Sequence, residues 1–291
     1  MKVLVTGAHG QLARSLQERA RHHSGIEVGF LSRPSLDLLQ PDSIRAAIVG
    51  AAPDVVINAA AYTAVDQAED DAETAFRINA TGAEAVAAAA ASAGAAVIQV
   101  STDYVFDGRG LRAYREDDPV NPLGVYGHSK LEGERAVRAA NPRNFIVRTA
   151  WVYSSFGHNF VKSIINAAKT RDRLRVVADQ FGNPTSASDL AEGLLRMLGA
   201  EDWGQTYHLA GTGSASWYEF AKEIMTHCAA LGLTHVPVEP LTTDEWPTRA
   251  VRPARSTLSS EKFQADFGFT MPAWQASLRP VIEAIAALRA E

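Results

Sequence analysis

A tyrosine and a lysine four positions apart have side chains that could act together in proton transfer. Tyr126 and Lys130 stand in the order Tyr-x-x-x-Lys. In a helix, side chains at this spacing lie on one face, with Cβ atoms about 5–6 Å apart. An unperturbed phenol has a pKa of about 10, and a nearby cation favours the phenolate. Such a phenol could protonate a carbonyl oxygen while a hydride adds to the carbonyl carbon. The spacing also fits two residues packed on an ordinary helix, so it needs support from other segments.

The N-terminal segment offers that support, because it has the pattern of a dinucleotide-binding turn. The aliphatic run 2–6 is typical of a buried strand, and a helical pattern covers 14–21. Between them, Gly7-x-x-Gly10-x-x-Ala13 would let the backbone approach a pyrophosphate at a helix N-terminus. Standard dehydrogenases have Gly-x-Gly-x-x-Gly, and Ala is tolerated at the third position. A turn directly after the first strand favours cofactor binding over a glycine-rich turn without a ligand.

Hydroxyl and carboxylate groups follow the hydrophobic run Val97–Ser101. Thr102 and Asp103 stand at its end, and open α/β sheets bind ligands outside the carboxyl ends of their strands. Thr102 could hydrogen-bond a substrate carbonyl, and Asp103 could hold a sugar hydroxyl or assist proton transfer. The alternative is that both residues form a turn or cap the next element.

The motifs, taken in order, resemble one family. They are Gly7-x-x-Gly10-Gln11-Leu12, Asn58–Asp66, Ser101–Gly108, Tyr126-Gly127-x-x-Lys130, Arg148–Tyr153 and Asp179–Thr185. Together they span nearly the whole chain and resemble the dTDP-4-dehydrorhamnose reductases, extended short-chain dehydrogenase/reductases of nucleotide-sugar metabolism. The resemblance implies reduction of dTDP-4-dehydro-L-rhamnose to dTDP-L-rhamnose, for the biosynthesis of cell-surface polysaccharides such as lipopolysaccharide.

The same resemblance implies roles for four catalytic residues. Tyr126 would give a proton to the sugar oxygen, and Lys130 would lower the pKa of Tyr126 and hold the nicotinamide ribose. Thr102 would donate a hydrogen bond to the carbonyl oxygen, with Asp103 alongside it. The hydride itself would come from the cofactor.

The residues after the second strand bear on the choice of cofactor. NAD-preferring sites usually have an acidic residue there, but this strand ends in Ser32-Arg33. Arg33 could pair with a 2′-phosphate, which favours NADPH, with NADH as the alternative; an exposed loop arginine is the competing interpretation. The family places Asp37-Leu38 beside the adenine, and the small residues after the third strand admit the cofactor. The predicted cofactor-binding residues are Gly7, Gly10, Gln11, Leu12, Arg33, Asp37, Leu38, Ala59, Ala60, Ala61, Tyr126 and Lys130.

Four further residues are candidates for the nucleotide-sugar substrate, beside Thr102 and Asp103. Trp151 matches the family tryptophan that packs against the sugar, although a core aromatic would fit the sequence equally. Arg252 and Arg255 could neutralise a diphosphate, since a guanidinium suits bidentate phosphate contact, or could simply be solvated. Asn159 would contact the nucleotide phosphates.

Composition excludes several other classes of function. The 291 residues are 46% hydrophobic and 21% charged, with a formal net charge of −5, which argues against nucleic acid as a partner. Cys228 is the single cysteine, so no intrachain disulfide forms, and no cysteine or histidine cluster has zinc spacing. No apolar stretch approaches membrane-spanning length, and a cytoplasmic location is expected. Some family members bind Mg²⁺ at a dimer interface through glutamates; on that resemblance alone Mg²⁺ is a candidate ligand, and the oligomeric state, a homodimer included, stays open.

Strand and helix patterns alternate through the first half of the chain. This alternation predicts an α/β fold with a doubly wound parallel sheet, a Rossmann domain. We expect an NAD(P)-binding domain over 1–150 with return segments at about 174–210, and a smaller substrate-binding lobe over 151–173 and 211–291. Strands are predicted at Val3–Thr6, Glu27–Leu31, Val55–Asn58, Val97–Ser101 and Phe145–Thr149, and helices include Leu12–His22, Pro41–Gly50, Glu73–Ala93 and Ser129–Ala140.

Two kinds of rival fit the same motifs. A nucleotide-sugar dehydratase, an epimerase or a reductase for another sugar would share the fold, but the dehydratase pattern has Glu after the Thr-Asp pair, where Tyr104 stands here. The second alternative is a non-catalytic protein similar to the regulatory subunit of methionine adenosyltransferase. The presence of Tyr126, Lys130 and Thr102 favours a catalytic reductase.

Overall fold

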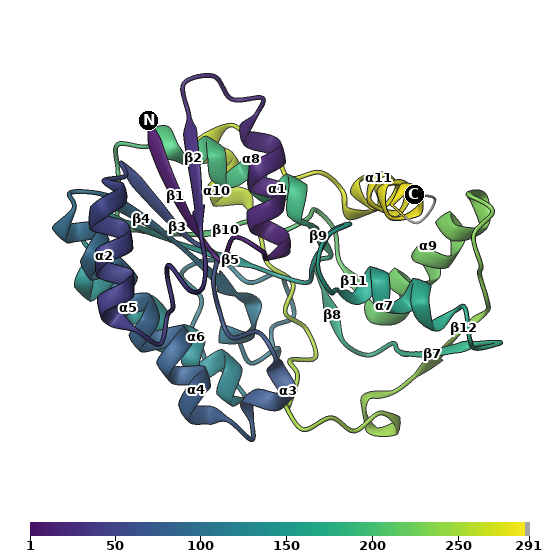
Figure 1. The fold of residues 1–291 in the computed structure, drawn as a ribbon. Coiled ribbons are helices and arrows are strands. Elements are labelled where there is room, and N and C mark those ends of the chain that lie inside the picture. Colours follow the sequence, from purple (N-terminus) through teal and green to yellow (C-terminus); the bar gives the residue numbers. More distant parts are fainter. Residues whose placement is uncertain (289–291) are drawn as a thin grey trace.

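Six parallel strands form the central sheet of the molecule. The computed structural model describes residues 1–288. The strand order is β10-β5-β4-β3-β1-β2, and every neighbouring pair is parallel (Figure 1). Parallel strands covered on both faces are continuous apolar runs, and β3, for example, is buried along its whole length. The predicted doubly wound sheet is confirmed. The strands are β1 (Lys2–Thr6), β2 (Glu27–Leu31), β3 (Val55–Asn58), β4 (Ala96–Thr102), β5 (Asn144–Thr149) and β10 (Gln205–His208).

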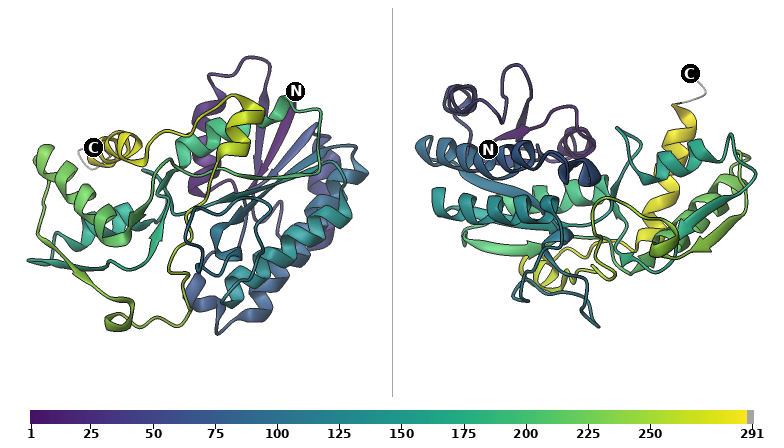
Figure 2. Two further views of the ribbon diagram at one scale, coloured as in Figure 1. Left: turned by 180° about the vertical axis from the view of Figure 1, so that it is seen from behind. Right: turned by 90° about the horizontal axis from the view of Figure 1, so that it is seen from below.

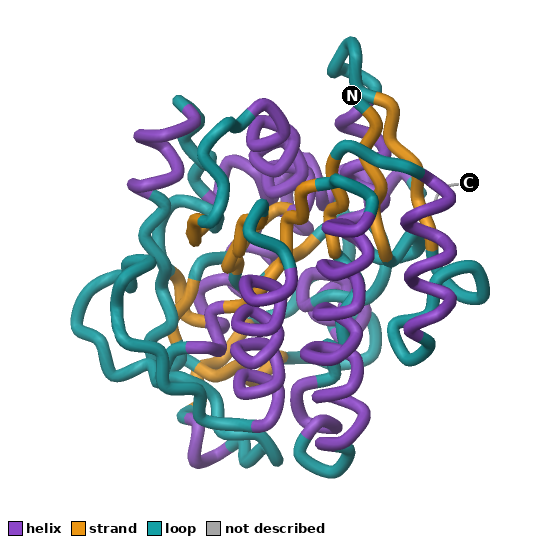
Figure 3. Tube along the Cα trace, turned by 90° about the vertical axis from the view of Figure 1, so that its left-hand side faces the viewer, coloured by secondary structure: helices purple, strands orange, loops and turns teal. Residues whose placement is uncertain are grey.

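Helices cover both faces of this sheet. On one face, Ile44, Val86 and Val137 from three helices share an aliphatic cluster with the strands; Figure 3 shows helices of this face in front of the strands. On the opposite face, Leu16 and Leu194 belong to a second cluster. The helices of the first face are α2 (Pro41–Ala51), α5 (Ala83–Ser92) and α6 (Val125–Ala140), and those of the second are α1 (Gln11–Ala20), α8 (Ala187–Arg196) and α10 (Glu261–Phe267).

A smaller lobe with its own core lies beside the sheet (Figures 1 and 2). Ile165, Phe220 and Leu278 pack together in this core, each from a different helix. A capping box begins the second of these helices: the Ser216 side chain accepts from the Glu219 N–H, and Glu219 accepts from the Ser216 N–H. The elements are α7 (Phe160–Ala167), α9 (Trp217–Ala230), α11 (Trp274–Ala287) and the strand pairs β7 (Leu174–Val177) with β12 (Val238–Leu241) and β8 (Phe181–Gly182) with β11 (Ala215–Ser216).

The division between the two cores differs from the expected boundaries. Leu174 and Val176 of β7 belong to the core of the lobe, although they fall in the segment expected to return to the sheet. The reason is that β7 pairs with β12 and not with the central sheet. Conversely, Phe263 of α10 packs on the sheet, although it lies in the portion assigned to the lobe. The chain therefore passes between the two cores more often than the sequence suggested.

Short elements complete the fold, and one of them interrupts a predicted helix. The segment predicted as a single helix over Glu73–Ala93 contains a π-helical turn, η1. Within residues 1–288, no helix combines the length and the apolar character that crossing a bilayer requires. The remaining elements are α3 (Val65–Ala68), α4 (Ala72–Phe76), η1 (Arg77–Gly82), η2 (Asp103–Val105), β6 (Val152–Tyr153) paired with β9 (Thr185–Ser186), η3 (Met197–Gly199) and η4 (Thr243–Glu245).

Candidate active site

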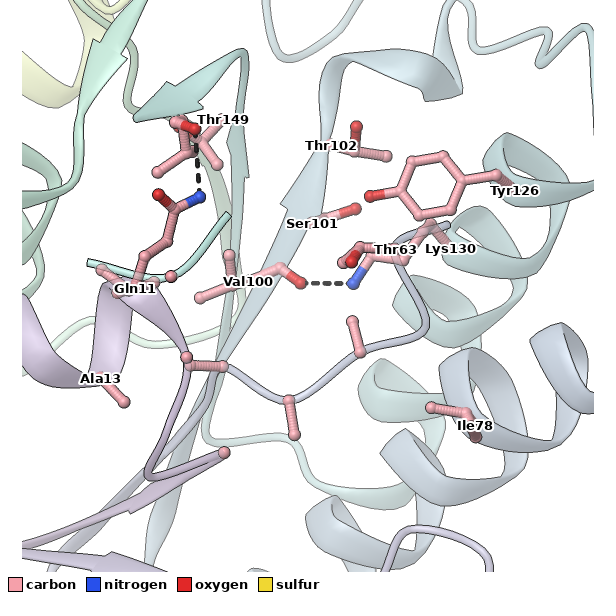
Figure 4. A pocket seen from close by; sticks show the side chains of 18 of the residues that line it. Gln11, Ala13, Thr63, Ile78, Val100, Ser101, Thr102, Tyr126, Lys130 and Thr149 are labelled. Atoms are coloured by element: carbon pink, nitrogen blue, oxygen red, sulfur yellow. Dashed lines mark hydrogen bonds between the residues drawn. The ribbon is translucent and has the colours of Figure 1, made fainter. Parts of the chain in front are cut away.

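A cavity of about 930 Å³ lies where several sheet strands end, and the smaller lobe borders it. The carboxyl edge of a parallel sheet is where open α/β folds bind ligands, and the volume is in the range of cofactor and ligand sites. Figure 4 shows side chains from the glycine turn and from α6 facing this space. The predicted site residues that line it are Gly7, Gly10, Gln11, Leu12, Arg33, Asp37, Leu38, Ala59, Ala60, Ala61, Thr102, Asp103, Tyr126, Lys130 and Trp151.

The glycine turn has the shape that a dinucleotide cradle requires. Gly7 adopts φ +80°, and a Cβ there would lie 3.2 Å from the Cα of Ala60, so glycine suits both the backbone conformation and the close approach. The N–H of Gly10 donates to the carbonyl of Gly7 at 2.8 Å. Gly10 is also the N-cap of α1, which has no side-chain cap. Backbone N–H groups at the start of α1 can therefore meet a phosphate.

Arg33 and Asp37 line the cavity from the segment that follows β2. Arg33 is exposed, directly after β2, so its guanidinium is free to reach a ligand phosphate. The Asp37 carboxylate accepts the N–H of Leu39 at 3.0 Å, which orders the loop that follows β2. These positions fit the adenosine end of a dinucleotide whose pyrophosphate meets α1.

Tyr126 and Lys130 lie in the first two turns of α6. This helix begins at Val125, four residues before the predicted start, so the tyrosine is held on the helix and not on the preceding loop. In Figure 4 the Tyr126 hydroxyl points toward Ser101 and Thr102, while the Lys130 ammonium meets the end of β4. The Nζ of Lys130 donates to the carbonyl of Val100 at 2.7 Å.

The pKa of Tyr126 differs from the expectation. Burial, together with the charge of Asp103, raises the pKa of Tyr126 to about 12, although a hydrogen bond with Thr102 acts in the opposite direction. Burial lowers the pKa of Lys130 to about 8, against the attraction of Glu134. The expected lowering of the Tyr126 pKa by Lys130 is therefore wrong for these side-chain positions, because the ammonium faces a backbone carbonyl.

Thr102 and Asp103 lie together at the end of β4, where Ser256 joins them. The Thr102 hydroxyl donates to Oδ1 of Asp103 at 3.1 Å, and the Ser256 hydroxyl donates to Oδ2 at 2.5 Å. Burial raises the pKa of Asp103 to about 6, while the hydrogen bonds from Ser256 and Thr102 lower it. Ser256 was not among the residues predicted for the site; it directly follows Arg255, a predicted substrate residue.

Trp151 presents an aromatic surface to the cavity, stacked on a second tryptophan. The ring centroids of Trp151 and Trp217 are 3.4 Å apart, with 5° between the ring planes, and both residues line the cavity. Trp151 has φ +47°, an uncommon conformation for a residue with a side chain. A Cβ on Gly182 would lie 2.6 Å from the Trp151 ring. Trp217, which was not among the predicted site residues, thus also lines the cavity.

Three predicted substrate residues do not line the cavity. Asn159 caps α7, where its Oδ1 accepts the Lys162 N–H at 3.2 Å and its Nδ2 donates to neighbouring backbone carbonyls. Arg252 forms an ion pair with Asp66 at 2.7 Å. The guanidinium of Arg255 lies 4.8 Å from the centroid of the Phe181 ring.

A buried polar network connects α6 to the two strands beside it. Glu134 of α6 accepts the Ser101 hydroxyl at 2.6 Å and pairs with Arg148 of β5 at 2.8 Å. Both charged side chains are at most 6% exposed. The network ties α6, which carries Tyr126, to β4, which carries Thr102, and to β5. Among the described residues, no cluster of three or more His, Cys, Asp or Glu side chains has the arrangement of a metal site.

Comparisons with known proteins agree with this geometry. The family described as RmlD substrate binding domain matches residues 1–287. A dTDP-4-dehydrorhamnose reductase of Sinorhizobium fredii is 44% identical over 98% of both chains. The crystal structure of a dTDP-4-dehydrorhamnose reductase from Clostridium acetobutylicum superposes with a TM-score of 0.93 at 43% identity, covering 98% of this chain and 100% of that one. The enzyme of that name from Bacillus anthracis, solved in complex with NADP, gives 0.91 at 36% identity, covering 97% and 98%.

Proposed function

The chain belongs to the RmlD substrate binding domain family, and from this membership we propose that it reduces dTDP-4-dehydro-L-rhamnose to dTDP-L-rhamnose with NADPH. Relatives named dTDP-4-dehydrorhamnose reductase match it over nearly their full length at 38–44% identity. The protein is therefore an NADP-dependent oxidoreductase of dTDP-rhamnose biosynthesis. The structural observation that carries the proposal is that the glycine turn and the Tyr126 hydroxyl open into one cavity.

The cofactor residues are assigned from the shape of the cavity. When bound, NADPH supplies the hydride. The start of α1, with Gly7 and Gly10, would hold the pyrophosphate of NADPH. The small side chains of residues 59–61 leave room for the cofactor. Arg33 would pair with the 2′-phosphate, and NADH remains the weaker alternative. Lys130 would hold the nicotinamide ribose.

Tyr126 is the proton donor in this proposal. A phenol with a pKa near 12 stays protonated at neutral pH. Hydride addition to the sugar carbonyl creates an alkoxide, which is a stronger base than a phenolate and takes the proton. The high pKa therefore keeps the acid loaded until the hydride arrives.

The substrate side of the site comes from the smaller lobe. Trp151, backed by Trp217, would pack on the sugar ring. Arg252 and Arg255 would approach the diphosphate only by leaving Asp66 and Phe181, their present partners. Asn159 would act indirectly, by fixing the turn before α7.

Tyr104 bears on the choice between reduction and dehydration. It follows Asp103 directly, and its pKa is raised by burial and by the neighbouring carboxylate. A neutral phenol here cannot serve as the second carboxylate of an elimination. A regulatory protein without activity would not need Tyr126, Lys130 and Thr102 on one cavity wall.

The cellular setting follows from the same reaction. We place the protein in the cytoplasm, where a nucleotide sugar would be its small-molecule partner. A homodimer and a bound Mg²⁺ remain proposals based on family resemblance. The assignment of the sheet to the cofactor and of the smaller lobe to the sugar is likewise a proposal, supported by the two separate cores.

A reduction assay tests the proposal. Purified protein would be mixed with NADPH and enzymatically prepared dTDP-4-dehydro-L-rhamnose, and absorbance of the reduced nicotinamide followed, with NADH in a parallel series. We expect sugar-dependent consumption of NADPH and formation of dTDP-L-rhamnose, identified by chromatography. Cofactor binding without turnover would reject this substrate and favour either another nucleotide sugar or the regulatory protein.

A further inference from the structure

The side chain of Gln11 joins the glycine turn to the segment that enters the smaller lobe. Gln11 is the first residue of α1 and lines the cavity. Its Nε2 donates to the carbonyl of Val152 at 3.0 Å, and its Oε1 accepts from the Ser154 hydroxyl at 3.2 Å and from Nδ2 of Asn159 at 3.3 Å. In Figure 4 the side chain extends from the start of α1 toward Thr149, the last residue of β5. One amide therefore bonds three groups of the segment 152–159, which leads from β5 into α7.

The backbone of the same residue lies where a diphosphate is expected. The first N–H groups of a helix have no acceptor within the helix, and Gly10 provides no side-chain cap. The N–H of Arg14 is the one that donates back to the Gly10 carbonyl, at 3.0 Å. The N–H of Gln11 therefore precedes the hydrogen-bonded part of α1, at the end where the helix dipole attracts an anion. A diphosphate bound there and the segment 152–159 would both act on Gln11.

The segment 152–159 begins beside Trp151, the residue proposed to pack on the sugar. The Val152 carbonyl, which accepts from Gln11, is one residue beyond Trp151. The Trp151 carbonyl accepts the Thr185 N–H at 3.2 Å. Trp151 has φ +47°, and a side-chain-bearing residue keeps such a conformation only where the surrounding structure holds it. The Gln11 amide therefore helps to fix the backbone next to the Trp151 ring.

Internal contacts make the rest of this segment one unit. The Phe156 N–H donates to the Ser154 hydroxyl at 3.1 Å, and Nδ2 of Asn159 donates to the Ser154 carbonyl at 2.8 Å. The Asn159 side chain also caps α7. The guanidinium of Arg14, in the next turn of α1, lies 4.1 Å from the centroid of the Phe156 ring. A displacement of the first turn of α1 would therefore reach both the start of α7 and the backbone beside Trp151.

We propose that Gln11 is a positioning residue that couples the two ligands of the site: its backbone N–H meets the cofactor diphosphate, and its side chain holds the segment 152–159 where Trp151 meets the nucleotide sugar. The proposal rests on the proposed function, because it takes a dTDP sugar as the second ligand. A diphosphate at the start of α1 restrains its first turn, and with it the anchor of the segment 152–159. The sugar then has less of the lobe to order, so each ligand should raise the affinity for the other.

Calorimetry with NADPH and dTDP-L-rhamnose measures this coupling. Both compounds are reduced forms, so they bind together without turnover. For the parent we expect saturating NADPH to lower the Kd for dTDP-L-rhamnose by about 5- to 150-fold, the usual range of coupling between two sites. Gln11→Met keeps the backbone N–H and a similar volume but has no amide, so the ratio of the Kd values without and with NADPH should fall to about one. The Kd for NADPH alone should stay near that of the parent.

Gln17 provides a matched control, because it is exposed further along the same helix. Gln17→Met should keep the parental ratio. A ratio of one in the parent, or the parental ratio in Gln11→Met, would overturn the proposal. Weaker binding of each ligand alone with an unchanged ratio would make Gln11 a structural contact only. Should Gln11→Met not fold, Ser154→Ala removes one of the three bonds from the other side and should lower the ratio part of the way.

Amide hydrogen exchange tests the link without any sugar, and so separates it from the proposed function. In the parent, added NADPH should slow exchange at the start of α1 and across 152–159, as measured by mass spectrometry of peptides. In Gln11→Met the slowing should remain at α1 and disappear from 152–159. Equal slowing of 152–159 in both proteins would count against the link. The expected pattern in a protein that does not bind dTDP-L-rhamnose would reject the proposed substrate while supporting the role of Gln11.

Discussion

Replacing Tyr126 with phenylalanine removes the proposed proton donor and little volume. We expect kcat for reduction of dTDP-4-dehydro-L-rhamnose to fall by about 10²–10⁴-fold, the usual contribution of general acid catalysis. Binding of NADPH should change little, because the ring remains and the glycine turn is untouched. Steady-state oxidation of NADPH measures the first quantity, and fluorescence titration with NADPH measures the second.

Tyr104 offers a control for this substitution. Its ring contacts that of Tyr126 edge-on, with centroids 5.6 Å apart, and it lines the same cavity. Tyr104→Phe should therefore cost far less activity than Tyr126→Phe. Comparable losses from the two changes would mean that the Tyr126 hydroxyl is not the acid.

Arg33 should decide between the two nicotinamide cofactors. A charge-assisted hydrogen bond to a phosphate contributes about 1.5–3 kcal/mol, so Arg33→Ala should raise the KM for NADPH by about 10- to 100-fold. NADH lacks the 2′-phosphate, and its KM should stay nearly constant. Parallel kinetics with the two cofactors make the comparison, and equal increases would place Arg33 away from the 2′-phosphate.

At the residue scale, the sequence predicted which side chains line the cavity but not which hydrogen-bond partners they have. Tyr126, Lys130 and Thr102 were placed by local motifs, and all three line the cavity. Local spacing carries no information about a partner 153 positions away, so the contact of Ser256 with Asp103 was missed. It also could not show that Lys130 donates to the Val100 carbonyl.

At the scale of elements, α6 joins Tyr126 and Lys130 to the sheet. The sequence predicted its start at Ser129. The helix begins at Val125. A Cβ on Gly127 would lie 2.3 Å from the Tyr104 carbonyl oxygen, so this glycine serves close packing within the helix. Tertiary contact, which local propensity does not report, decides this boundary.

The ion pair of Glu134 with Arg148 anchors α6 on β5, and its loss should destabilise the protein. Glu134→Ala leaves the Arg148 guanidinium buried without its partner, which typically costs about 3–5 kcal/mol. Glu132 lies on the same helix but pairs with Arg135 in solvent, with both side chains more than half exposed. Glu132→Ala should therefore cost less than about 1 kcal/mol.

Urea unfolding of the parent and both variants gives these free energies. The expected order is a large loss for Glu134→Ala and nearly none for Glu132→Ala. Similar small losses would show that the buried pair contributes little beyond the packing of α6.

At the scale of the whole molecule, two cores are joined by segments that cross between them. The sequence predicted two parts from the change in regularity after Trp151, but it could not assign β7 or α10, because each pairs or packs with residues far along the chain. The segment that carries Ser256 contacts both parts: Arg252 pairs with Asp66 of α3, and the Ser256 N–H donates to the carbonyl of Phe181 in β8. The cavity lies between the parts that this segment connects.

At the scale of the whole molecule, protonation of His208 should lower the stability of the protein at acidic pH. His208 is the last residue of β10 and is fully buried. Burial, together with repulsion from Arg148, lowers the pKa of His208 to about 3. A folded pKa below the unfolded value of about 6.5 contributes stability that is present above pH ~6.5 and lost as pH falls toward 3. Between about pH 7 and pH 4.5 this amounts to about 2–3 kcal/mol. Glutamine does not titrate, so between these two pH values the free energy of unfolding of His208→Gln should fall by about 2–3 kcal/mol less than that of the parent. Urea unfolding at both pH values measures this difference.

Replacement of the exposed His235 by Gln controls for the loss of a histidine, and carboxylates titrate alike in all three proteins. If the free energy of unfolding falls equally in acid for the parent and for His208→Gln, then His208 does not couple stability to pH.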